Sequence, residues 1–223
     1  MARRSRVALP GDAEAARERL MDAAEACVEQ YGVAKTTMDD IAKMAGVSRP
    51  TVYRHFSDRD SLILAVVMRR SRMLVGRATK IIARYESFPD QLVEGLLFLV
   101  EKGRKDPFVR LLVAPEHLEL ANRILGGNVP VSLTHEMWEP ILTEARERGE
   151  LRADLDFDAI SRWLTYLIIL LLGRFATDDD VATQREMLKT FVVPAFVPET
   201  APVQGRVSAR RTSAVRRRAT GTG

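Results

Sequence analysis

The sequence of 223 residues predicts an all-α protein, and two observations on its patterning lead to this class. Nearly every segment spaces its apolar residues with the helical period of about 3.6 residues. No segment combines period-two alternation with the β-branched and aromatic residues that strands favour. At about 150 residues per domain, the length suits one compact unit or two small ones with a hydrophobic core.

The composition excludes several classes of protein. Hydrophobic residues make up 46% of the chain and charged residues 29%, which excludes a fibre or a disordered chain. The single cysteine offers no disulfide framework and indicates a reducing compartment. The longest charge-free apolar stretch, Trp163 to Leu172, has ten residues, whereas a membrane span needs about 20. No signal-peptide pattern follows the basic N-terminus, so we expect a cytoplasmic protein without a membrane partner.

Charge is distributed unevenly along the chain. Residues 1–10 carry +3 and residues 203–223 carry +6, whereas residues 76–202 carry −5. Residues 11–75 are neutral in sum but contain a +3 patch at 43–59. This asymmetry predicts a polyanionic partner near the N-terminal region and argues against one across the acidic middle. The ends, 1–11 and 203–223, are expected to be a disordered basic arm and a disordered Arg-rich tail.

Caps and breakers delimit the expected helices. The first runs from the cap Asp12 to the residue before Gly32, and a long one runs from about Asp58 into the mid-eighties. Shorter helices are expected over about 90–104, 107–125 and 132–149. A helix over 156–175 is apolar on every side, which requires cover from its own domain and from a second copy of the chain. A final amphipathic helix ends near Pro194 to Pro198.

Residues 37–56 have the pattern of a helix-turn-helix. Thr37 and Asp40 form a capping-box-like start, and Gly46 suits the left-handed end of that helix. Ser48 is expected to cap the second helix, where Pro50 is tolerated in the first turn. The apolar positions that pack the two helices are Ile41, Ala42, Ala45, Val47, Val52 and Phe56.

The second of these helices has an inward side fixed by Val52 and Phe56, so its opposite side faces solvent. The major groove of DNA reads groups on the N-terminal part of such a helix, and helix-start amides favour phosphate. The residues suited to base contact are Arg49, Thr51 and Tyr53, and Pro50 also faces outward at this DNA-binding side. Those suited to phosphate are Ser48, Arg54, His55 and Arg59.

Three stretches, Gly32-Val-Ala-Lys-Thr-Thr, Ile41-Ala through Gly46-Val-Ser, and Thr51-Val-Tyr-Arg-His-Phe, together resemble the tetracycline-repressor (TetR) family of bacterial regulators. The resemblance spans roughly residues 12–70. It implies a helix-turn-helix domain over 12–57, with the helix from Arg49 to Phe56 reading bases. It also implies phosphate contacts by Thr37, Tyr53, His55 and Arg59, so base and phosphate contact both stay open for Tyr53. Arg59 stands where the family commonly has Lys.

The resemblance further implies a helical effector-binding and dimerisation domain over 58–202. Such a protein is a repressor, associated with the nucleoid, that forms a homodimer on a palindromic double-stranded DNA operator and is released by a small-molecule effector. Aromatic and Met side chains suggest an apolar pocket and effector; these are Phe98, Phe108, Met137, Trp138, Trp163 and Tyr166. The residues expected at the dimer interface are Leu164, Ile168, Ile169, Leu170, Leu171, Leu188 and Phe191.

The sequence leaves open a regulator without an effector and disfavours an enzyme. A helix-turn-helix regulator or architectural protein without an effector would have a C-terminal core filled with side chains. A small helical enzyme is disfavoured, because the sequence lacks a nucleophile, base and orienter set and a glycine-rich phosphate loop. His117 and His135 have no second ligand at helical spacing, so we expect no metal site and no cofactor.

Overall fold

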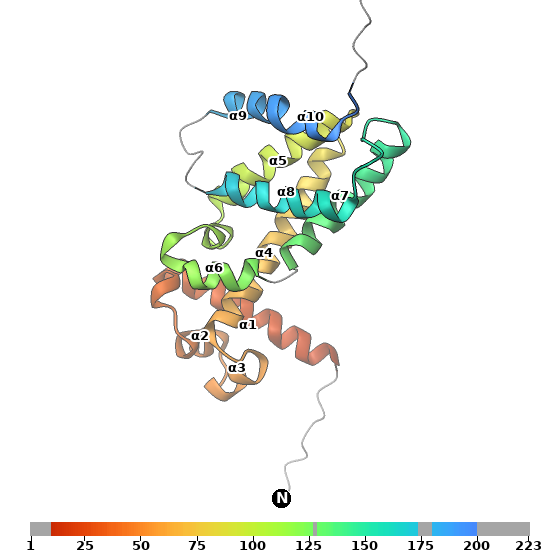
Figure 1. The fold of residues 1–223 in the computed structure, drawn as a ribbon. Helices are drawn as coiled ribbons and strands as arrows, with labels where there is room; N and C mark the ends of the chain where they lie inside the picture. The colour runs from red at the N-terminus through yellow and green to blue at the C-terminus, as the bar shows by residue number, and fades with distance from the viewer. Residues whose placement is uncertain (1–9, 127–128, 174–179, 200–223) are drawn as a thin grey trace, which may run out of the picture.

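A computed structural model describes residues 10–126, 129–173 and 180–199, and all regular elements within these ranges are helical (Figure 1). The first elements are α1 (Pro10–Tyr31), the 3-10 turn η1 (Val33–Lys35), α2 (Met38–Ala45), α3 (Arg49–His55) and α4 (Arg59–Ile82). Then come α5 (Phe88–Lys105), the 3-10 turns η2 (Val109–Leu112) and η3 (Pro115–His117), α6 (Leu118–Leu125), α7 (Val129–Glu147) and α8 (Phe157–Leu172). The last are α9 (Val181–Met187), a π-helical turn (Leu188–Val192) and α10 (Val193–Phe196). The predicted all-α fold is confirmed.

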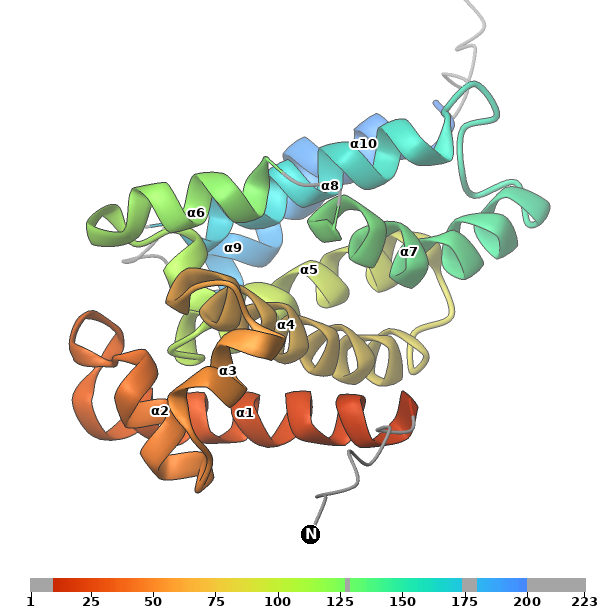
Figure 2. The ribbon, with the colours of Figure 1, turned by 90° about the horizontal axis from the view of Figure 1, so that it is seen from below.

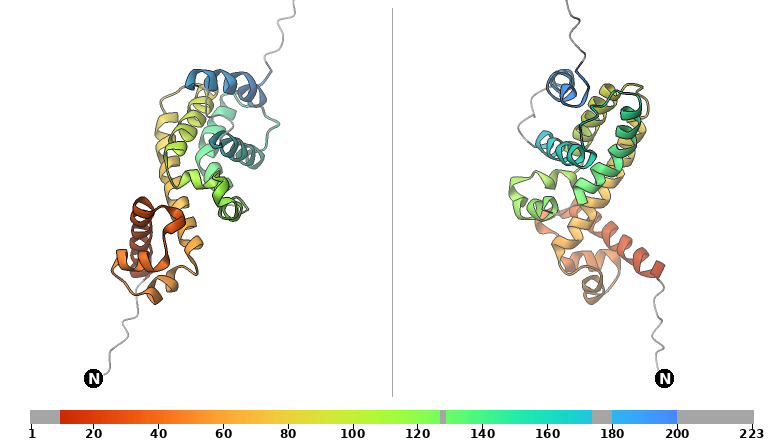
Figure 3. Two further views of the ribbon diagram at one scale, coloured as in Figure 1. Left: turned by 90° about the vertical axis from the view of Figure 1, so that its left-hand side faces the viewer. Right: turned by 45° about the vertical axis from the view of Figure 1, so that its right-hand side comes forward.

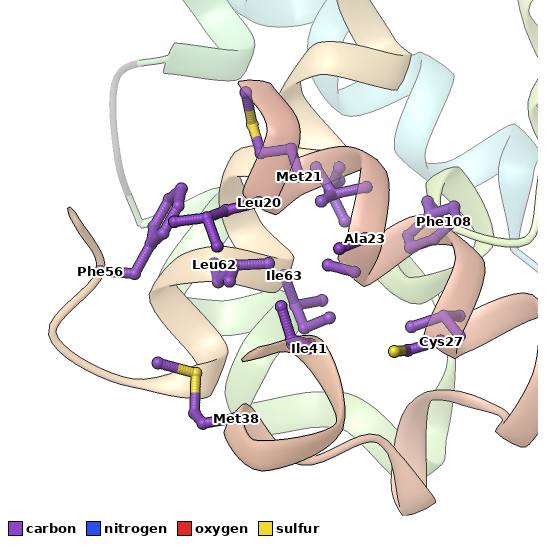
Figure 4. Close-up of a cluster of buried hydrophobic side chains, with 14 of the residues drawn as sticks. Leu20, Met21, Ala23, Cys27, Met38, Ile41, Phe56, Leu62, Ile63 and Phe108 are labelled. Carbon is purple, nitrogen blue, oxygen red and sulfur yellow. The ribbon is translucent and has the colours of Figure 1, made fainter. Parts of the chain in front are cut away.

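Helices α1, α2 and α3 form a small unit at one end of the molecule, and the first turns of α4 complete its core (Figures 1 and 2). Figure 4 shows Leu20 of α1, Ile41 of α2 and Leu62 of α4 converging in this core, and all three are almost fully buried. Asp58 begins α4 with a capping box, in which its side chain accepts a hydrogen bond from the backbone N–H of Ser61. The predicted start of the long helix is therefore confirmed.

Helix α4 continues out of this unit into the larger C-terminal part, so a single helix belongs to both (Figure 3). There α5 packs along α4, and α7 packs against α8, while α9 and α10 lie at the far end. Helices α4 and α7 approach α5 closely at Gly95. A Cβ atom at Gly95 would lie 2.7 Å from Cδ1 of Ile82 and 3.0 Å from Cη2 of Trp138.

Two helices predicted as continuous are interrupted in the structure. The segment expected as one helix over 107–125 is split into η2, η3 and α6. Asp106 starts the first of these turns, because its side chain accepts hydrogen bonds from the backbone N–H groups of Phe108 and Val109. Pro115 explains the split, because proline has no backbone N–H to donate and disfavours a helical conformation of the residue before it. The last helix widens into a π-helical turn just before Pro194, since proline has no N–H to donate to the preceding turn.

Residues 1–9 of the predicted basic arm, with Arg3, Arg4 and Arg6, and the Arg-rich tail lie outside the described residues. Pro10 and Gly11 are helical, so α1 begins two residues before the predicted cap Asp12. Within the described ranges, no helix combines the length and hydropathy required to cross a membrane.

Candidate functional site

Helix α2 begins with the predicted capping box of Thr37 and Asp40 and ends at the predicted glycine, Gly46. The Thr37 hydroxyl lies 2.6 Å from Oδ2 of Asp40, and the Asp40 backbone N–H donates to that hydroxyl at 3.2 Å. The hydroxyl of Thr37 lowers the pKa of Asp40 below its usual value, so the cap is charged at neutral pH. Gly46 ends the helix with φ of 66°, a left-handed conformation that glycine adopts without a steric penalty. These features fix the turn that leads into α3.

Ser48 occupies the predicted N-cap position of α3, but its side chain caps no backbone group. Its hydroxyl lies 2.9 Å from the hydroxyl of Thr51 instead. The prediction of the helix start is confirmed, and the prediction of a side-chain cap is wrong, because Thr51 offers a nearer partner one turn later. Both hydroxyls thus lie together at the leading end of α3.

The side of α3 opposite its buried residues is open to solvent. Val52 is fully buried and Phe56 nearly so, as predicted. Arg49, Pro50, Tyr53 and Arg54 are exposed. The Arg49 guanidinium bonds Asp39 at 3.2 Å and the Tyr53 hydroxyl at 3.3 Å. A DNA phosphate or base edge would compete with Asp39 for this exposed guanidinium.

Two residues expected on phosphate are turned toward the protein. Nε2 of His55 is buried and has no hydrogen-bond partner among the described residues. The Arg59 guanidinium donates to the backbone carbonyl of Val33 in η1 and pairs with Asp60 at 3.6 Å. In this conformation Arg59 holds the turn between α1 and α2. Phosphate contact by either residue stays a prediction and requires its side chain to reorient.

Sequence reasoning missed Arg17 of α1. Its guanidinium lies 4.1 Å from the centre of the Phe56 ring and donates to the His55 carbonyl at 3.1 Å. A cation over an aromatic face is favourable, and the carbonyl lies at the C-terminus of α3, where positive charge is stabilising. Arg17 therefore holds the C-terminal end of α3 against α1. No local sequence signal reveals this, because the partners are 38 residues apart.

A cavity of about 80 Å³ lies between α4, α5, η2, α7 and α8. Its lining contains no charged side chain. The apolar lining residues are Met68, Leu74, Val75, Leu99, Val109, Leu112, Pro130, Leu133, Met137, Ile168, Ile169 and Leu172. The polar ones are the hydroxyl residues Ser71, Thr134 and Thr165.

Only part of the predicted ligand-binding set surrounds this cavity. Met137 lines it, whereas Phe108 and Trp138 are buried in the packed cores. Phe98 lines a separate groove between α5 and α9. Trp163 and Tyr166 point outward from α8 and are more than half exposed. The helical pattern identified α8 as apolar all round, but it did not reveal which face the domain covers.

The comparisons with known proteins agree with this architecture. A family model described as bacterial regulatory proteins, tetR family, matches residues 20–66. The uncharacterized HTH-type transcriptional regulator Rv2250c of Mycobacterium tuberculosis is 39% identical over 140 residues, which covers 60% of this chain and 69% of that protein. The chain belongs to the TetR family. This TetR-family protein is therefore a DNA-binding transcription regulator with a helix-turn-helix.

Solved structures of TetR-family repressors share its fold. AlkX from Dietzia sp. matches with a TM-score of 0.60 and 25% identity, covering 80% of this chain and 94% of AlkX. Thermus thermophilus FadR, in complex with lauroyl-CoA, matches with a TM-score of 0.60 and 24% identity, covering 85% of this chain and 99% of FadR. The likeness to FadR shows the fold alone.

The TetR-family protein exposes large apolar side chains on α8 and on the π-helical turn near its C-terminus. Trp163, Tyr166 and Leu170 of α8 are each more than half exposed, and Phe191 is 75% exposed. Leu164 and Leu188, expected at the dimer interface, are buried in the chain's own core. Ile168 and Ile169 line the cavity, and Leu171 packs partly buried against that core. Leu170 and Phe191 are exposed, and the dimer interface stays a prediction.

Proposed function

We propose that this protein is a repressor that binds a palindromic operator as a homodimer and is released by an apolar small molecule. Helix α3 enters the major groove with its exposed side, where Arg49, Tyr53 and Arg54 contact bases or phosphates. Arg54 is an exposed cation of α3, and its side chain makes no hydrogen bond or ion pair with any described residue. Its guanidinium is therefore free to bind DNA.

One observation carries the effector role. The small unit of α1, α2, α3 and the first turns of α4 is the proposed DNA-binding unit. Met68 of α4 and Leu133 of α7 line the cavity and also belong to the buried core of this unit. The turn η2 makes the same connection, because Val109 faces the cavity while Leu111 packs in that core. Phe108, directly before this turn, belongs to the same buried cluster as Cys27 of α1, and Figure 4 labels both. A ligand that displaces the cavity wall therefore displaces residues that position α1.

The size of the cavity gives the direction of the effect. Ligand pockets in proteins usually measure about 300–1,000 Å³, and this cavity measures about 80 Å³. An effector of ordinary size must widen the cavity as it binds, so it binds the widened conformation better than the one described. Differential affinity of this kind shifts the population toward the widened conformation, and we propose that this conformation is the one that releases DNA.

The exposed apolar side chains of α8 and of the π-helical turn support the homodimer. Trp163, Tyr166, Leu170 and Phe191 are large apolar side chains that a second copy of the chain would cover. Pairing through α8 and the helix after it would give a four-helix bundle with two-fold symmetry. A two-fold dimer presents its two α3 helices to the half-sites of a palindrome.

The test uses a cavity-filling substitution on an operator selected from a random duplex pool. Val75→Phe places a ring in the cavity, and Met73→Phe places one on the exposed side of the same helix as the control. We expect Val75→Phe to mimic the effector and weaken operator binding by about 5- to 150-fold, the range of allosteric coupling. Met73→Phe should bind like the unmodified protein. Equal operator affinity in all three proteins would contradict the effector role.

The small cavity volume favours one alternative, a regulator without an effector. In that case, apolar compounds would leave operator affinity unchanged, and Val75→Phe would only lower the free energy of unfolding. Operator titration in the presence of short-chain alcohols and ketones separates the two candidates, because only the repressor with an effector responds.

A further inference from the structure

The cavity contains a pair of buried hydroxyls whose hydrogen bonds can be counted. Thr134 of α7 and Thr165 of α8 are both nearly fully buried, and their Oγ1 atoms lie 2.8 Å apart. Thr134 donates to the Pro130 carbonyl at 3.0 Å. Thr165 is within donating distance of Thr134 and of the Ser161 carbonyl, the latter at 2.7 Å. Two hydroxyl hydrogens thus serve three acceptors.

This count leaves lone pairs and no spare hydrogen. Each threonine hydroxyl has one donor and two acceptor sites. The Oγ1 of Thr165 accepts no hydrogen bond from the described residues, and that of Thr134 accepts at most the one from Thr165. A ligand group that donates a hydrogen bond fits this pair. A ligand carbonyl or carboxylate meets lone pairs and gains a donor only if an existing bond breaks.

The rest of the lining restricts the ligand further. The lining residues include no Lys, Arg or His that would neutralise an anion and no Asp or Glu that would pair with a cation. Burying an unpaired charge is strongly unfavourable. Ser71 of α4 has no side-chain hydrogen bond to another described residue, so it offers one more neutral hydroxyl.

We infer that the effector class is a neutral, mainly apolar molecule with a hydroxyl group, which donates a hydrogen bond to the Thr134–Thr165 pair. This inference rests on the proposed function, because it takes the cavity as the effector site. It assigns specificity to two threonines on neighbouring helices. The ligand hydroxyl donates to one of the two threonines, which already join α7 to α8 through their own hydrogen bond, and the apolar part of the ligand occupies the widened cavity.

The experiment compares 2-hexanol with 2-hexanone, which share a carbon skeleton and differ by a hydroxyl against a carbonyl. Dissociation constants are measured by ligand-detected NMR on the full chain, with hexanoate as the charged probe. The ratio of the two constants is compared between proteins, so that the intrinsic hydrophobicity of the two probes cancels. We expect the preference for 2-hexanol to fall about 3- to 10-fold in Thr165→Val, the value of one hydrogen bond.

Three further variants guard against a structural explanation. Thr134→Val should lower the same ratio, and Thr165→Ser, which keeps the hydroxyl, should retain it. Thr143→Val is the matched control, because Thr143 is exposed on α7 and makes the same bond to the carbonyl one turn earlier. Its ratio should equal that of the unmodified protein.

Four results would overturn the inference. These are equal binding of 2-hexanone and 2-hexanol, an unchanged ratio in Thr165→Val, tighter binding of hexanoate than of 2-hexanol, and no saturable binding of either neutral probe up to its solubility limit. Operator release is measured separately. If 2-hexanone binds as tightly as 2-hexanol and both release DNA, the proposed function stands and the hydroxyl inference fails. If 2-hexanol is preferred but operator affinity does not change, the ligand class stands and the effector role fails.

Discussion

Arg69 of α4 joins the DNA-binding unit to the rest of the protein through three carboxylates of α1. Its guanidinium bonds Glu25 at 2.6 Å and both Glu18 and Asp22 at 2.8 Å. Burial of the guanidinium lowers the pKa of Arg69. The hydrogen bonds to these carboxylates raise the pKa by more than burial lowers it, so the net pKa is above the ordinary value. Arg69 is therefore charged at any pH at which the protein folds.

The stability that Arg69→Met would lose is the sum of the contributions of its three ion pairs to the free energy of unfolding. The Arg69 and Glu25 side chains are each only 18% exposed, so this charge-assisted bond is worth about 1.5–2 kcal/mol. Glu18 and Asp22 are much more exposed, so each of these pairs adds at most about 0.5 kcal/mol. We expect Arg69→Met to lower the free energy of unfolding by about 1.5–3 kcal/mol, or Tm by about 3–12 °C.

The assay is urea unfolding followed by circular dichroism at one protein concentration. Arg72→Met on the same helix is the control, because Arg72 is exposed and has no hydrogen bond or ion pair to a described residue. A double-mutant cycle with Glu25→Gln isolates the pair energy. A loss below about 0.5 kcal/mol, or a coupling energy near zero, would refute the reasoning that α1 is held to α4 by this cluster.

Three other predictions follow from single contacts. Gly95→Ala should lower the free energy of unfolding by about 1–3 kcal/mol, because its Cβ would lie 2.7 Å from the Ile82 side chain; an unchanged urea midpoint would contradict this. Asp58→Ala should cost about 0.5–2 kcal/mol at pH 7. The backbone N–H of Ser61 lowers the pKa of Asp58, so this contribution is present above the ordinary carboxyl pKa and is lost as pH falls through the lowered value. Unfolding at pH 7 and pH 3 checks the sign. Arg54→Ala should weaken operator binding in gel shifts while leaving Tm unchanged, and full affinity would exclude Arg54 from the interface.

Local signals predicted the DNA-binding unit well. The start of α2 at Thr37, its end at Gly46 and the start of α4 after Asp58 were all readable from the sequence. Each depends on hydrogen bonds between residues three or four positions apart, so the sequence around the helix end contains both partners. The inward positions Val52 and Phe56 were equally readable, because helical period fixes which side chains share a face.

The candidate ligand site was predicted less well. Apolar and aromatic composition indicated a pocket in the C-terminal part, but it selected Trp163 and Tyr166, which face outward, and it missed Ser71, Thr134 and Thr165. Composition identifies side chains that need cover. It does not identify the element that covers them, since that element comes from a distant part of the chain.

The sequence by itself determined the helix-turn-helix, the starts of α2 and α4 and the family, because these depend on neighbouring residues and on a contiguous motif. Only the tertiary structure decided that Arg59 holds η1, that Arg17 covers Phe56, and that η2 packs into the DNA-binding core. Arg17 and Arg59 lie 38 and 26 residues from the carbonyls they bind. Contacts of this kind depend on how whole helices pack, and helical periodicity leaves that arrangement open.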